Sequence, residues 1–158
     1  MGTNYSRQIA GAVNDFLEGD DWNFSFDRDK GMFTFNLTIK SKMKKVKYYI
    51  DIKDDRFVVY AVLPISADTD DPAMMREMAE FLHRANYGLL CGNFEFDFRD
   101  GEIRYKAFVD CDGIIPTKAM IRNSIYLTKL MFDRYAPGLE KIIFMGGRAK
   151  EAIQMCEK

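Results

Sequence analysis

Hydrophobic and polar residues alternate along six stretches of the chain, and helical spacing fills most of the segments between them. Apolar residues at helical spacing predict helices over 7–18, 72–86 and 117–135, followed by a short final helix after Gly146-Gly147. Because proline interrupts a helix, Pro137-Gly138 predicts a break before 139–145. The alternating stretches predict strands over 22–26, 33–39, 46–53, 56–63, 89–98 and 102–109.

Turn residues between these strands allow registers to be predicted, because a shift of one residue would reverse the two faces of a strand. The turn at 28–31 and the Asp54-Asp55 turn each define a hairpin with one apolar face. The pairs expected on these faces are Phe26–Phe33, Phe24–Phe35, Trp22–Leu37, Ile52–Phe57, Ile50–Val59 and Tyr48–Ala61.

The third hairpin is marked by Asp100-Gly101, a strong short-range turn signal, and carries several acidic residues that suggest acid/base chemistry or a cation site. The predicted register places each acid opposite a base on the side away from Phe94 and Phe96, which favours a structural role for the charges. The expected pairs are Arg99–Glu102, Asp97–Arg104 and Glu95–Lys106.

The predicted order of elements is α-ββββ-α-ββ-α, which mixes hairpins with segregated helices. This order favours an α+β fold with a mostly antiparallel sheet and helices packed on it. The 158 residues are enough for one domain, 1–158, and 47% hydrophobic residues are ordinary for a globular chain.

The second face of the third and fourth strands lacks the clean polar pattern of a solvated sheet. Tyr49 is expected opposite Tyr60, and Val58 and Val62 point the same way. Two explanations remain open: a helix of the same chain covers this face, from 7–18 or from the C-terminus, or self-association or a bound polypeptide does. These four residues are the predicted protein-binding residues.

No motif in the sequence predicts a catalytic residue, a metal site or a cofactor site. His83 is the only histidine, and we expect it on a helix surface or core edge. Asp68, Asp70 and Asp71 lack the remaining residues of a calcium loop, and Gly146-Gly147-Arg148 lacks those of a phosphate loop, so capping and helix punctuation are expected. An enzyme with a site scattered over Asp110, Asp112 and His83 remains an alternative.

Five lysines fall within eight residues, next to Tyr48 and Tyr49, and predict a solvated hairpin or a protected strand edge. Weak, salt-dependent binding of nucleic acid through 40–47 is the second alternative. It is not favoured, because 23 basic and 24 acidic residues leave a formal charge of −1. The lysines are Lys40, Lys42, Lys44, Lys45 and Lys47.

A cytoplasmic location is expected, because the sequence shows no secretion signal and no apolar run long enough to span a membrane. Cys91, Cys111 and Cys156 are odd in number and lack paired spacing, which suits a reducing compartment. We expect Cys91 to face outward and Cys111 to lie opposite Leu90, without a disulfide.

Segments 86–90, 92–97 and 100–105 resemble the core hairpin of the bacterial YbjN family, and 132–135, followed by Pro137 and 142–147, resembles its last helix. The resemblance covers about two thirds of the chain and implies a fold similar to type III secretion chaperones, which are dimers that hold partner polypeptides. It implies no catalytic residue and no binding residue that can be transferred.

The leading hypothesis is therefore a non-catalytic protein-binding or dimerising module of the YbjN type, regulatory or chaperone-like, and not an enzyme. The expected partners are a second copy of the chain and, as an alternative, a polypeptide client. Nucleic acid and membrane are not expected partners.

Overall fold

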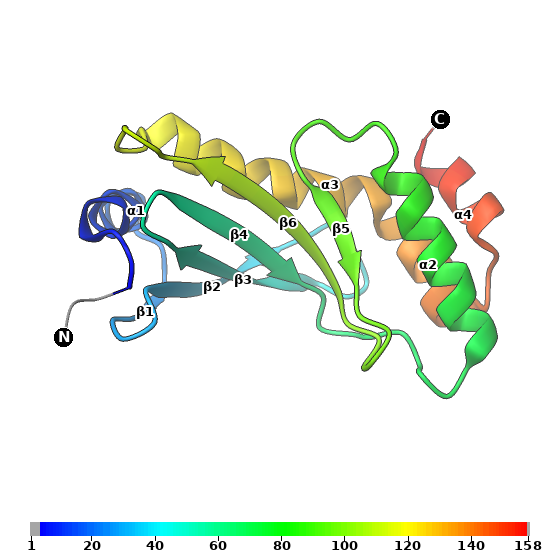
Figure 1. Cartoon of the computed structure of the whole chain (residues 1–158). Coiled ribbons are helices and arrows are strands. Elements are labelled where there is room, and N and C mark those ends of the chain that lie inside the picture. The colour runs from blue at the N-terminus through cyan, green and yellow to red at the C-terminus, as the bar shows by residue number, and fades with distance from the viewer. Residues whose placement is uncertain (1–3, 158) are drawn as a thin grey trace.

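The computed structural model describes residues 4–157, which form a six-stranded sheet and four helices. All neighbouring strands are antiparallel, in the order β1-β2-β3-β4-β6-β5 (Figure 1). The α+β prediction is confirmed. The elements are α1 (Arg7–Gly19), β1 (Ser25–Asp27), β2 (Met32–Thr38), β3 (Lys45–Ile52), β4 (Arg56–Val62), α2 (Pro72–Asn86), β5 (Asn93–Phe96), β6 (Ile103–Asp110), α3 (Lys118–Met145) and α4 (Ala149–Cys156).

Capping side chains begin three of the helices. Ser6 accepts a hydrogen bond from the backbone N–H of Ile9 at α1, and Asp71 accepts one from Met74 at α2. Thr117 accepts one from the backbone N–H of Met120 at the start of α3. The predicted capping role of Asp71 is confirmed.

The core lies on one side of the sheet, where α1 and α3 cover the apolar side chains of the strands (Figure 1). Tyr48 in β3 donates a hydrogen bond from its hydroxyl to the backbone carbonyl of Ile125 in α3, at 2.8 Å. Trp22 lies among aromatic rings of α1, β2 and α3. We call this side of the sheet the inner face and the opposite side the outer face.

The two remaining helices extend the structure beyond the sheet, where α2 lies beside the edge strand β5 and α4 packs on α2 and α3. The Asn86 side chain at the end of α2 binds the backbone of Phe94 in β5. Glu77 in α2 accepts a hydrogen bond from the backbone N–H of Ala149 at the start of α4, at 2.6 Å.

The predicted break at Pro137 is wrong, because α3 continues as one helix to Met145. A proline inside a helix costs about 3 kcal/mol. Tyr135, Ala136, Gly138 and Leu139 around it are buried against neighbouring elements, and this packing offsets the cost. The helix ends instead at Gly146, in the left-handed conformation that glycine adopts readily.

The registers of the second predicted hairpin are confirmed in full, and those of the first only in part. β3 and β4 pair Ile52 with Phe57, Ile50 with Val59 and Tyr48 with Ala61. Phe26 pairs with Phe33, but β1 comprises only Ser25–Asp27, so the predicted pairs further along are wrong. Trp22 lies outside the strand and contacts Phe35, with 5.0 Å between ring centroids, rather than pairing with Leu37.

Candidate functional site

The four predicted binding residues lie together on the outer face, in the middle of the sheet. Tyr49 pairs with Tyr60, as predicted, while Val58 and Val62 flank Tyr60 on the same side of β4. All four side chains are partly buried. Within residues 4–157 no helix covers them, because α1 packs on the inner face and α4 on α2 and α3 (Figure 1). The explanation that α1 or α4 covers the outer face is therefore wrong.

Positively charged side chains lie over the aromatic rings of the outer face. The Arg104 guanidinium lies 4.3 Å from the centre of the Tyr60 ring, and Lys47 lies 5.4 Å from the centre of the Tyr49 ring. Cation–π attraction favours these positions, and the aliphatic stems shield part of each ring from water. The outer face thus combines an apolar centre with cationic side chains that a partner can displace or bind.

Sequence reasoning missed Phe108, which lies opposite Val58 on the outer face and is 54% exposed. Its position beside Val58 depends on the pairing of β4 with β6, and these two strands are separated in the sequence by a helix and another strand. The signal available in the sequence was the alternation of β6 itself, which places Phe108 on the same side as Arg104 and Lys106.

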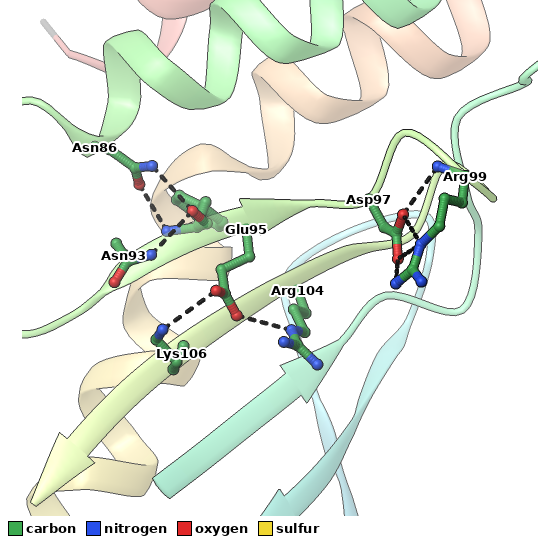
Figure 2. Close-up of polar contacts among 8 residues, drawn as sticks. Asn86, Asn93, Glu95, Asp97, Arg99, Arg104 and Lys106 are labelled. Carbon is green, nitrogen blue, oxygen red and sulfur yellow. Dashed lines mark hydrogen bonds and ion pairs between the residues drawn. The ribbon is translucent and has the colours of Figure 1, made fainter.

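The acidic hairpin has a different register from the predicted one, although the acids still bind bases (Figure 2). Glu95 pairs with Arg104 across the strands and forms ion pairs with Arg104 at 2.8 Å and Lys106 at 3.2 Å. Asp97 binds Arg99, at 2.8 Å, instead of Arg104. Hydrogen bonds from the side chain and backbone of Arg99 lower the pKa of Asp97 to about 2.

The shift in this hairpin comes from its turn, which is wider than the two-residue Asp100-Gly101 turn that we expected. The backbone N–H of Asp97 donates to the carbonyl of Glu102, and Gly101 adopts a φ of 78° against Ala67. The predicted pairs Arg99–Glu102, Asp97–Arg104 and Glu95–Lys106 are therefore wrong as registers. A shift of two residues keeps every side chain on its predicted face, because the period of a strand is two.

The alternative catalytic residues do not form one site. His83 is exposed on α2, beside β5, whereas Asp110 ends β6 opposite Arg56 and Asp112 follows in the next loop. No group of three or more histidine, cysteine or acidic side chains among the described residues is arranged to hold a metal ion.

The cysteines occupy three separate places, and all three are free thiols. The Cys91 sulfur lies 3.6 Å from the hydroxyl of Tyr105, and Leu90 is 99% exposed. Cys111 is buried at the end of β6, so its predicted position opposite Leu90 is wrong. Burial raises the pKa of the Cys111 thiol, which disfavours the reactive thiolate.

The glycine pair at 146–147 ends one helix and precedes another, as predicted. The first backbone N–H groups of a helix are the position where a phosphate could bind. Here the Glu77 carboxylate takes that position by accepting the N–H of Ala149. The segment therefore separates two helices, and a carboxylate of the chain itself takes the place of a bound anion.

The lysine-rich segment runs from the loop between β2 and β3 into the start of β3, and two carboxylates hold the loop against α3. The backbone N–H of Lys40 donates to Asp133 at 2.7 Å. Glu140 accepts the Ser41 hydroxyl at 2.7 Å and the backbone N–H of Lys42 at 2.9 Å. The backbone of this loop is thus tethered, while all five lysine side chains remain exposed.

Comparisons with known proteins identify the fold and a family. The model of the YbjN family, described as "Putative bacterial sensory transduction regulator", matches residues 10–141. No curated protein matches the sequence. No helix in the described part of the chain is long and apolar enough to cross a membrane.

Several solved structures have a similar fold. The crystal structure of YbjN from E. coli, described as a putative transcription regulator, has a TM-score of 0.59 and 11% sequence identity over 92% of each chain. A chain of the HopA1–SchA chaperone–effector complex has a TM-score of 0.50 and 14% identity, over 82% of this chain and 92% of that chain. The predicted resemblance to the YbjN family and to a chaperone fold is confirmed.

Proposed function

The chain belongs to the YbjN family, and from that premise we propose that it is a non-catalytic protein-binding module, regulatory or chaperone-like, that acts through its outer face. The contact residues in this proposal are Tyr49, Val58, Tyr60 and Val62. The fold shared with a chain of a chaperone–effector complex supports a polypeptide as the partner, because it gives a precedent on the same architecture.

The observation that carries the proposal is the asymmetry between the two faces of the sheet. The inner face is covered by α1 and α3, whereas the outer face carries a tyrosine pair flanked by two valines and Phe108, with no helix over it in residues 4–157. Exposed apolar patches with aromatic centres are typical of protein contact surfaces. A partner that covers these rings removes their apolar surface from water, and this burial favours association.

In the absence of another partner we propose a homodimer formed through this face, since two-fold assemblies use the same patch on both subunits. A bacterial cytoplasm is the proposed compartment. The three free cysteines support it, because a reducing environment maintains free thiols.

The test is size-exclusion chromatography with light scattering on the wild type and on Tyr60→Asp. Tyr60 is partly exposed and its ring contacts Arg104, so an aspartate at this position retains a favourable neighbour and the fold is expected to persist. The matched control is Tyr87→Asp, because Tyr87 is 93% exposed and lies outside the outer face. Circular dichroism verifies the fold of each variant.

The expected result is a dimer for the wild type and the control, and a monomer for Tyr60→Asp. A wild-type monomer excludes the homodimer, and the polypeptide client is then tested by co-purification from the native cell with wild type and Tyr60→Asp. A specific protein that the wild type and Tyr87→Asp retain and Tyr60→Asp loses would support the proposal. Equal recovery by all three would refute binding through the outer face.

A further inference from the structure

The lysine-rich loop and the start of β3 carry five unpaired positive charges, and two of them, Lys45 and Lys47, lie at one end of the outer face. Lys53, Arg104 and Lys106 elsewhere on this face form ion pairs. Within residues 4–157 none of the five lysines of segment 40–47 forms one. Because like charges repel, holding five together without counterions costs stability. The chain nevertheless holds the backbone of this loop in place through Asp133 and Glu140.

A hollow of about 360 Å³ lies beside these charges on the outer face. Its apolar lining comes from Tyr49, Val62, Leu63 and Pro64, and its polar lining from Asn36, Lys45 and Lys47. An apolar floor with cationic side chains at the margin is suited to a ligand that carries both apolar groups and negative charge.

A second hollow, of about 260 Å³, adjoins the first at Tyr49 and Val62, which line both. It extends towards Tyr60 and Arg104 and is also lined by Met32 and Glu102. Together the two hollows form a trough across β3 and β4, which we call the outer trough. Neighbouring side chains on one face of a strand are about 6.6 Å apart, so an extended polypeptide can place alternate side chains along it.

We propose that the lysine end of the outer trough binds an acidic polypeptide segment that also carries aromatic or large apolar residues. This inference rests on the proposed function, because the trough is part of the outer face. Carboxylates of the segment pair with Lys45 and Lys47, while its apolar side chains contact Tyr49 and Val62. Tethering of the loop by Glu140 holds the cationic end in position before the partner arrives, which lowers the entropy cost of binding.

A polypeptide fits the charge pattern better than a nucleic acid does. Beyond the basic end, Glu95 and Asp51 on the outer face already bind Arg104, Lys106 and Lys53, so the cations there are neutralised. A continuous phosphate backbone would find few free cations there, whereas a polypeptide can place its carboxylates only where the lysines lie.

The test uses a fluorescein-labelled peptide of four Glu-Glu-Phe repeats, with fluorescence anisotropy at 50 mM and 150 mM salt. The comparison probes are a peptide of four Lys-Lys-Phe repeats and a twelve-nucleotide oligothymidine. The protein variants are Lys45→Glu/Lys47→Glu and a matched double variant, Lys118→Glu/Lys150→Glu, which makes the same charge change at exposed lysines of α3 and α4. Circular dichroism and light scattering are recorded on the same samples.

The expected result is binding of the acidic peptide alone, weakened at least tenfold by Lys45→Glu/Lys47→Glu and weakened by less than threefold in the matched control. Equal binding by both double variants, or no binding by the wild type, overturns the inference. Oligothymidine bound as tightly as the acidic peptide overturns it in favour of a nucleic-acid surface. Loss of the wild-type dimer in Lys45→Glu/Lys47→Glu without loss of peptide binding overturns it in favour of a second copy.

A failure of this inference can be distinguished from a failure of the proposed function. If Tyr60→Asp abolishes association while Lys45→Glu/Lys47→Glu binds the peptide normally, the outer face remains the contact surface and only the acidic specificity fails. If Tyr60→Asp changes neither association nor client recovery, the proposed function itself fails.

Discussion

The side-chain amide of Asn86 forms hydrogen bonds with both backbone groups of Phe94, which face the free edge of the sheet (Figure 2). Its oxygen accepts the Phe94 N–H at 2.6 Å, and its nitrogen donates to the Phe94 carbonyl at 2.9 Å. This is the pattern that a residue of a neighbouring strand would make. Asn86 therefore shields an edge strand that could otherwise pair with another chain.

Replacing Asn86 by leucine is expected to destabilise the fold by about 1–3 kcal/mol, because the backbone N–H of the buried Phe94 loses its acceptor and the Phe94 carbonyl keeps only the Asn93 side chain as a donor. The exposed edge should also cause concentration-dependent association beyond the wild-type oligomer. Urea denaturation and sedimentation velocity measure the two effects. Tyr87→Ala is the control, since this neighbouring side chain is 93% exposed. Wild-type stability and association in Asn86→Leu would contradict the role assigned to this amide.

Gly138 lies where α3 crosses α2 and α4, and its substitution by alanine should be destabilising. An added Cβ would overlap the ring of Phe81 and approach the carbonyl oxygen of Ala152 to 3.0 Å. The expected loss is about 1–3 kcal/mol in the free energy of unfolding, measured by urea denaturation.

The matched control is Gly11→Ala in α1, where the added carbon meets no atom within 4 Å beyond its chain neighbours and the backbone of its own helix. This substitution should raise the free energy of unfolding by about 0.5–1 kcal/mol, because alanine restricts the unfolded chain and favours helix. A similar change in both variants would contradict close packing at Gly138.

The stability of the fold should decrease at alkaline pH because of its buried tyrosines. Burial raises the pKa of Tyr48 above its ordinary value of 10.0, with a further increase from the charge of Asp133. Burial and then the hydrogen bond to Glu157 raise the pKa of Tyr135 to about 12. Above pH 10 the unfolded chain loses these protons while the folded chain keeps them, so stability is fully present below pH 10 and decreases above it.

Tyr48→Phe tests this dependence through a single residue. At pH 8 it should cost about 1 kcal/mol, because the hydrogen bond to the Ile125 carbonyl is lost. The decrease in the urea midpoint from pH 8 to pH 11 should then be smaller than in the wild type. An equal decrease in both proteins would show that Tyr48 does not contribute to the alkaline transition.

The tether between Glu140 and the lysine-rich loop should control the mobility of that loop. Glu140→Ala removes the acceptor of the Ser41 hydroxyl and of the Lys42 backbone N–H, so the Lys42 amide should exchange its hydrogen faster. Hydrogen exchange followed by mass spectrometry measures this change. The control is Glu151→Ala, which removes an exposed carboxylate from α4. Unchanged protection of Lys42 would mean that Asp133 alone holds the loop.

The sequence alone determined the hairpin of β3 and β4, including the Tyr49–Tyr60 pair at the centre of the candidate site. Strand period and a short turn suffice there, because the paired residues are close in sequence. The same period explains why Glu95 was assigned to the correct face although its register was wrong by two residues.

Only the tertiary structure decided what surrounds these residues. Packing of Gly138 keeps α3 continuous through Pro137, and the pairing of β4 with β6 adds Phe108 to the outer face. Glu140 binds Lys42 across 98 positions of sequence. Local periodicity determines which way a side chain points, but which distant segment it meets depends on how the whole core packs, and no local pattern encodes that.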